Sequence, residues 1–200
     1  DGKDIHRFTA AEVLGKSQDE VTSEERSHAK AVNFGIIYGI SDFGLSRDLG
    51  ITRQEAKNYI ELYFSRYPKV KEYMDNMVKK AHETGKVRTM FGRMRELPDI
   101  NSRNFNRRSF AERTAMNTPI QGTAADIIKL AMNKVESILE EKKFKSRLLL
   151  QVHDELVLEV VNDELDAIQT LLKETMESIV ELHVPLIVDV HNAENWALVK

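Results

Sequence analysis

The sequence predicts an α+β fold, in which a helical first half precedes a second half that contains a small antiparallel sheet. Apolar residues recur at helical spacing through most of the first hundred positions. Further along, two short apolar runs, LLLQV at 148–152 and LVLEV at 156–160, are joined by only three residues. Two such runs are typical of a strand hairpin. We therefore expect the two halves to meet near residue 100.

Local start signals divide the first half into successive helices. A short helical segment is expected first, and a threonine followed three residues later by a glutamate then recurs twice, which is capping-box spacing. A proline suits the first turn of a further helix. The expected positions are 4–14 for the first segment, Thr22 with Glu25, Thr52 with Glu55, and Pro68.

The second half is expected to combine a hairpin, two long helices and further strands. Residues 86–98 read as a first hairpin, and a helical stretch follows over about 105–142. Pro119 is expected to kink this stretch, because proline has no N–H and crowds the carbonyl four residues before it. An amphipathic helix is expected at 163–182. A last strand at 185–190, PLIVDV, is expected to complete the antiparallel sheet.

Composition excludes several classes of protein. Two hundred residues suffice for one good-sized domain or two small ones, and no cysteine is present for disulfides or thiolate metal sites. No apolar run approaches the roughly 20 residues of a membrane helix. A soluble, intracellular setting is expected. The chain opens DGKDIHRF without a methionine, and we expect it to be part of something longer.

Charge is unevenly distributed along a nearly neutral chain. Residues 79–113 hold ten Lys and Arg against four Asp and Glu, whereas residues 139–200 hold six against thirteen. A basic block beside an acidic one fits contact with a polyanion next to a site for cations. Ordinary solvated surface produces such blocks too, so charge alone does not decide between the two.

One stretch, RSHAKAVNFGIIYG, places four chemically distinctive side chains on one helix face. Arg26, Lys30, Phe34 and Tyr38, followed by Gly39, recur every four residues, and at about 100° per residue this spacing drifts only about 40° per step. We call these four the cation–aromatic stripe. Two cations followed by rings suit a ligand with a charged tail and a flat head, such as a nucleoside triphosphate. The alternative is an amphipathic helix with a solvated basic face and a phenylalanine packed on a neighbour, and the spacing alone favours this alternative.

A second set of polar residues also repeats every four positions. Arg113, Asn117 and Gln121 lie on one face of the expected long helix and can donate hydrogen bonds. The minor groove of a duplex presents acceptors at every base pair, so a row of donors could sense pairing without reading sequence. The polar outer face of a kinked helix is the alternative.

The third feature is VHDE at 152–155, between the two apolar runs. Carboxylates at a tight strand junction are typical Mg²⁺ ligands, and Asp154 and Glu155 supply two of them beside His153. The alternative is a polar β-turn, in which aspartate is common.

These segments resemble the family A DNA polymerases, of the bacterial DNA polymerase I type. The run from Arg26 to Gly39 resembles their motif B, and VHDE resembles their motif C. TPIQGTAADIIKLAM and QVHDELVLEV are similar almost throughout, and DIHRFTA resembles the segment shortly after motif A. The resemblance covers essentially the whole chain, with the motifs in the family's order.

The resemblance implies a subdomain and a role for each motif. Residues 1–100 would belong to the fingers, with a nucleotide-binding helix at about 23–39, and residues 101–200 to part of the palm. Arg26 and Lys30 would bind the triphosphate of the incoming nucleotide, and Phe34 would pack near its sugar and base. Tyr38 would lie at the template position, with Gly39 giving it room.

The remaining motif residues would contact DNA and metal. Arg113, Asn117 and Gln121 would follow the minor groove of the nascent duplex, and His153 would lie near the primer terminus. Asp154 would hold the catalytic metals, two Mg²⁺ ions in the intact enzyme, and Glu155 would support them, while Lys30 would assist catalysis. The implied partners are DNA primer–template and dNTP, with no membrane. The implied setting is the bacterial cytoplasm, at the nucleoid, or a phage.

The sequence departs from the family pattern in one important respect. A second metal-binding aspartate is expected in motif A, about 25 residues before Asp1, and the thumb and any exonuclease domain would also lie elsewhere. We therefore expect residues 1–200 alone not to polymerise DNA. A palm without one strand would expose apolar surface, so self-association and association with the missing N-terminal part are expected.

Two other functions fit part of the pattern. A single-subunit RNA polymerase of the phage type shares a Lys…Tyr-Gly helix and a His-Asp turn, although Phe34, Gln121 and Glu155 favour DNA synthesis. A non-catalytic module that binds nucleic acid would use the basic block for phosphate contacts. Such a module needs neither the stripe nor VHDE.

Overall fold

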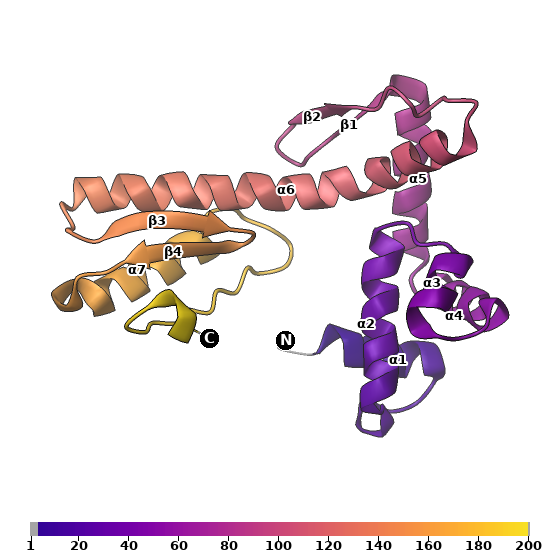
Figure 1. Cartoon of the computed structure of the whole chain (residues 1–200), viewed down its shortest axis with the longest axis horizontal. Helices are drawn as coiled ribbons and strands as arrows, with labels where there is room; N and C mark the ends of the chain where they lie inside the picture. The colour runs from indigo at the N-terminus through magenta and orange to yellow at the C-terminus, as the bar shows by residue number, and fades with distance from the viewer. Residues whose placement is uncertain (1–3, 200) are drawn as a thin grey trace. The chain divides into compact units, whose positions relative to one another are not determined.

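The computed structural model describes residues 4–199, which form two compact units, one up to residue 120 and one from residue 121 onward. The first unit is mostly helical, and the second combines helices with a strand hairpin (Figure 1). Helices and small antiparallel sheets together confirm the predicted α+β class.

In the first unit, short helices pack in pairs and bury separate hydrophobic clusters. The elements are α1 (Ile5–Leu14), η1 (Gln18–Glu20), α2 (Ser23–Ile37), α3 (Asp42–Leu49), α4 (Arg53–Arg66), α5 (Pro68–Thr84), β1 (Lys86–Arg88) and β2 (Met94–Glu96). α1 packs against α2, and α3 packs against α4. One cluster of buried residues joins α1, α2, α3 and α4 through Val13, Val32, Ile36, Leu45, Ala56 and Tyr63.

The predicted start signals of these helices are confirmed. The Thr22 hydroxyl accepts the Glu25 N–H at 3.2 Å, and the Glu25 carboxylate accepts the Thr22 N–H at 2.9 Å. Thr52 and Glu55 form the same reciprocal pair, and Pro68 is the first residue of α5. Each box satisfies N–H groups that a helix start leaves without intrahelical partners.

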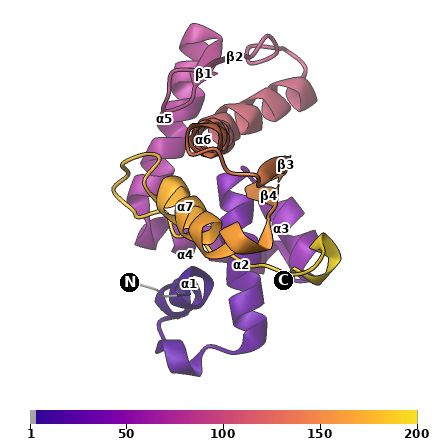
Figure 2. The same ribbon diagram turned by 90° about the vertical axis from the view of Figure 1, so that its left-hand side faces the viewer.

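The second unit is built on the C-terminal part of α6 (Phe105–Glu141), a helix that starts in the first unit and continues through Pro119. The other elements are β3 (Arg147–Val152), β4 (Glu155–Glu159), η2 (Asn162–Glu164), α7 (Leu165–Glu177) and η3 (Trp196–Leu198). Val135 and Leu139 of α6 pack against Ile168 and Leu171 of α7. Figure 2 looks along α6 and shows α7 and the β3–β4 hairpin beside it.

Two predictions for the second half are wrong. Residues 185–190 form no strand, so the sheet in this unit contains only β3 and β4 among the described residues. The Val188 N–H donates instead to Glu177 Oε1, at 3.0 Å, and this side-chain bond replaces a ladder bond. The last helix also ends at Glu177 rather than near 182, and Ser178, its C-cap residue, donates from both its N–H and its hydroxyl to the Glu174 carbonyl.

The end of α2 approaches α6 closely within the first unit. Gly39 follows the helix with φ +66°, a left-handed conformation that suits glycine. A Cβ at this position would lie 2.3 Å from Met116 Cε and 3.0 Å from Arg113 Cγ. Gly39 therefore serves both the backbone turn and the contact between the two helices.

We expect Gly39→Ala to destabilise the fold by roughly 2–3 kcal/mol, of which about 1–2 kcal/mol comes from the positive φ and the rest from crowding against Arg113 Cγ and Met116 Cε. Gly50→Ala is the matched control, because Gly50 has φ +67° but open space around its Cβ. Urea unfolding of both variants measures the difference. Equal losses of stability in the two variants would show that the close contact contributes nothing.

Candidate functional site

The cation–aromatic stripe lies on the exposed side of α2. Ala29, Val32 and Ile36 are at most 2% exposed and point the opposite way, into the core. The side chain of Arg26 is 40% exposed, and Phe34 and Tyr38 are 45% and 39% exposed. The predicted orientation of the helix is therefore confirmed. Large apolar rings left half-exposed beside cations are a surface suited to a ligand rather than to the core.

The aromatic part of the stripe is continued by a third ring from α1. The Phe34 and Tyr38 rings are nearly parallel, with centroids 6.4 Å apart and an interplanar angle of 13°. The His6 ring lies 5.6 Å from Phe34 at 46°. Three flat groups from two helices thus line one surface, which can hold a planar ligand by stacking.

A buried amide holds His6 in place. Asn33 is 9% exposed and donates from Nδ2 to His6 Nδ1 and to Thr9 Oγ1, both at 3.1 Å. Because Nδ1 accepts this bond, the proton of the neutral imidazole lies on Nε2. Burial lowers the pKa of His6, with smaller contributions from the charges of Arg26 and Lys30, against an opposing effect of Asp4. His6 is therefore a neutral hydrogen-bond donor near neutral pH.

The first cation of the stripe is paired with a carboxylate at the start of α1. Arg26 Nε donates to Asp4 Oδ2 at 2.6 Å, and Asp4 Oδ1 accepts the N–H groups of His6 and Arg7 at 3.0 and 3.1 Å. The bond from Arg26 is the main cause that lowers the pKa of Asp4 to about 2, with the Arg7 N–H next. Asp4 is therefore ionised throughout the physiological range.

Sequence reasoning did not single out Asp4, His6 or Asn33. Asp4 and Arg26 are 22 residues apart, so helical spacing along α2 contains no sign of their contact. Asn33 did carry a signal, because it lies among apolar residues on the buried side of the stripe helix. A polar residue in such a position needs a partner, and the partner here is His6.

The second polar set lies on α6, partly next to the end of α2. Arg113 contacts the Gly39 position and donates from Nη1 to Ser109 Oγ at 2.9 Å. Asn117 Oδ1 is buried and has no hydrogen-bond partner among the described residues. Gln121 is exposed and is the first residue of the second unit. Arg113 and the stripe thus share the first unit.

The VHDE residues form the tip of the β3–β4 hairpin in the second unit. Val152 pairs with Glu155, so His153 and Asp154 are the only two residues of the turn. His153 has φ +53°, a conformation in which His, Asn and Asp are enriched among residues other than glycine. Gln151 Nε2 donates to the His153 carbonyl and braces the turn. All three polar residues, His153, Asp154 and Glu155, are exposed.

The hairpin tip fits the chemistry of Mg²⁺ but not a complete site for two ions. Asp154 and Glu155 offer the hard oxygen ligands that Mg²⁺ prefers, and one or two carboxylates suit an ion that also binds phosphate. Within residues 4–199, no three His, Asp or Glu side chains gather in a way that could hold a metal ion. Further ligands are required for a pair of ions.

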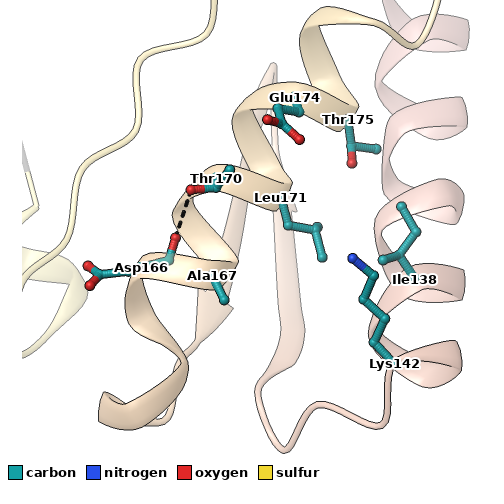
Figure 3. Close-up of a pocket in the computed structure, with 8 residues that line it drawn as sticks. All are labelled: Ile138, Lys142, Asp166, Ala167, Thr170, Leu171, Glu174 and Thr175. Atoms are coloured by element: carbon teal, nitrogen blue, oxygen red, sulfur yellow. Dashed lines mark hydrogen bonds between the residues drawn. The ribbon is translucent and has the colours of Figure 1, made fainter.

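A groove elsewhere in the second unit contains none of the predicted site residues. It lies between α6 and α7, and its volume is about 460 Å³ (Figure 3). Its lining residues are Ile138, Lys142, Asp166, Ala167, Thr170, Leu171, Glu174 and Thr175.

The described helices include none that is both long enough and apolar enough to cross a bilayer.

Comparison with known proteins places the chain in a family. Residues 1–198 match DNA polymerase family A. The chain is 58% identical over 196 residues to DNA polymerase I of Lactococcus lactis and 56% identical over 195 residues to that of Geobacillus stearothermophilus. Each match covers 98% of this chain but only 22% of the relative.

A solved structure agrees with the sequence comparison. The POL domain of Pol1 from M. smegmatis, in complex with DNA primer–template and dNTP, matches with a TM-score of 0.88 at 43% identity. The match covers 92% of this chain and 33% of that domain. The order of the three motifs, the fold and the relatives agree, and the chain belongs to DNA polymerase family A.

Proposed function

We propose that the protein containing this chain catalyses template-directed DNA synthesis, by transfer of a nucleotidyl group from a dNTP to a primer 3′-hydroxyl. The observation that carries the proposal is the exposed cation–aromatic stripe in a chain of family A. Phosphoryl transfer depends on positioning and charge stabilisation more than on covalent chemistry by the protein. The rings of the stripe can position a nucleotide and its cations can stabilise negative charge, and all four side chains lie along one helix.

In this proposal the stripe binds the incoming nucleotide. Arg26 and Lys30 contact the triphosphate, and the positive charge of Lys30 also stabilises the charge that develops during transfer. Phe34 packs near the sugar and base, and Tyr38 lies at the template position. The half-exposed, nearly parallel rings of Phe34 and Tyr38 support this assignment, because a base can stack on such a surface.

The remaining predicted residues are proposed to contact DNA. Arg113, Asn117 and Gln121 donate to minor-groove acceptors, Gly39 gives the template room, and His153 lies near the primer terminus. The contact of Arg113 with the Gly39 position supports a role beyond an ordinary solvated helix face.

Asp154 and Glu155 are proposed to contribute carboxylates to Mg²⁺ binding. When bound, Mg²⁺ would lower the charge on the phosphates and activate the primer hydroxyl, and two ions would act together in the complete enzyme. The residues of this chain supply only part of that site. The other ligands are proposed to come from a motif A outside residues 1–200.

Residues 1–100 are proposed to be fingers and residues 101–200 part of a palm. The division of the described residues near 120 reflects compactness and does not identify subdomains. DNA primer–template, dNTP and the rest of the polymerase are the proposed partners, and the bacterial cytoplasm is the proposed setting, in line with the bacterial relatives. Exposed Leu149, Leu150 and Ile187 support self-association of the isolated chain.

Replacing either cation of the stripe should weaken nucleotide binding. We expect Arg26→Ala and Lys30→Ala, made in the whole protein, to raise KM for dNTP roughly 10- to 100-fold, since each loses a charge-assisted hydrogen bond. Steady-state primer extension measures KM and kcat. Lys57→Ala, an exposed lysine on α4, is the control. Unchanged KM in both stripe variants would refute the proposed binding of the triphosphate by the stripe.

Removing the turn carboxylate should abolish synthesis without releasing DNA. We expect Asp154→Asn in the whole protein to lower kcat by roughly 100-fold or more while the Kd for primer–template changes little. Asp163→Asn, at a nearby helical turn of the same unit, should leave both unchanged. No synthesis by the unsubstituted whole protein, together with weaker primer–template binding upon Asp154→Asn, would instead support a non-catalytic binding module.

Purified residues 1–200 should not extend a primer in the presence of Mg²⁺ and dNTP, because two carboxylates do not complete a two-metal site. A gel-based extension assay with the whole protein as positive control checks this expectation. Extension above background that disappears in the Asp154→Asn variant of the same 200 residues would contradict it.

A further inference from the structure

A single carboxylate at the start of α1 both caps its own helix and binds the stripe. Asp4 Oδ1 accepts two backbone N–H groups of α1, from His6 and Arg7, and Asp4 Oδ2 accepts Arg26 Nε at 2.6 Å. A carboxylate fixed by two backbone bonds has little freedom to move, so the guanidinium that it binds is held too.

The geometry of the bond leaves most of the guanidinium available. An arginine side chain carries five N–H groups, one on Nε and four on the two terminal nitrogens. Among the described residues, Arg26 makes its side-chain hydrogen bond through Nε alone. The side chain is also 40% exposed. The terminal nitrogens can therefore bind a phosphate while Nε remains bonded to Asp4.

We propose that Asp4 is a positioning residue for nucleotide binding, which holds Arg26 by Nε so that its terminal nitrogens meet the triphosphate. This inference rests on the proposed function of the stripe. Holding a long side chain in its binding geometry removes the loss of rotamer freedom that binding would otherwise require. The carboxylate also repels phosphate, but it lies beyond Nε and at a solvent-exposed position where charges are screened.

The test is a double-mutant cycle in the protein that contains this chain, read out as KM for dNTP and kcat in primer extension. Asp4→Asn keeps a side-chain oxygen to cap α1 but removes the ionic bond to Arg26. We expect it to raise KM roughly 3- to 10-fold with kcat nearly unchanged. In an Arg26→Ala background the same change should have no further effect, because Asp4 acts through Arg26.

A second ion pair in the first unit is a matched control. Asp42 lies in the first turn of α3, and Asp42 Oδ2 accepts Arg53 Nε at the same distance, 2.6 Å, away from the stripe. Asp42→Asn should leave KM unchanged. An equal rise of KM in Asp42→Asn, or a rise upon Asp4→Asn that persists in the Arg26→Ala background, would overturn the proposal in favour of a purely structural role for Asp4.

Arg26→Lys tests the same inference if Asp4→Asn does not fold. A lysine has one ammonium group and cannot bind Asp4 through one nitrogen and phosphate through two others. We expect Arg26→Lys to raise KM nearly as much as Arg26→Ala, and a wild-type KM would overturn the inference. Unchanged KM in both Arg26→Ala and Lys30→Ala would refute the proposed function of the stripe. A raised KM in Arg26→Ala with no effect of Asp4→Asn would refute only the role of Asp4.

Discussion

The close packing of α1 against α2 determines what the stripe can be. Small residues at this interface, Ala10, Ala11 and Ala29, are at most 6% exposed and let the two helices approach. Once that side of α2 is buried, its opposite side must carry Arg26 and Lys30 in solvent, because the helix repeat leaves no other arrangement. The exposed rings follow from the same constraint.

A polar contact gives this interface its specificity. Asn33 is buried between the helices, and an unsatisfied amide there would cost about 1–3 kcal/mol. His6 and Thr9 satisfy it only when α1 and α2 are in the observed register. The same register brings Asp4 to Arg26 and His6 to Phe34, so the hydrogen bonds that stabilise the helix pair also arrange the candidate binding surface.

The features that could be predicted from the sequence are those determined over a few neighbouring residues. The pair Thr22 and Glu25 marks one helix start, and Pro68 marks another. The backbone N–H groups that the pair binds, and the N–H that proline lacks, all belong to the first turn of a helix. The strand expected at 185–190 failed because a strand also needs a neighbour for its backbone, and β-propensity does not show whether one is present. The bond between Asp4 and Arg26 joins residues on different helices, so no local pattern contains it.

The two carboxylates of the hairpin tip, Asp154 and Glu155, are not equivalent, although the sequence presents them as a pair. Glu155 begins β4 and is paired with Val152, so its side-chain direction is tied to the alternation of the strand. Asp154 lies in the turn, where that alternation does not apply, next to His153 in a left-handed conformation. Because only Glu155 follows the alternation of the strand, a rigid hairpin does not bring the two carboxylates to one ion in the same way. This difference supports the proposal that Asp154 binds metal directly and that Glu155 assists it.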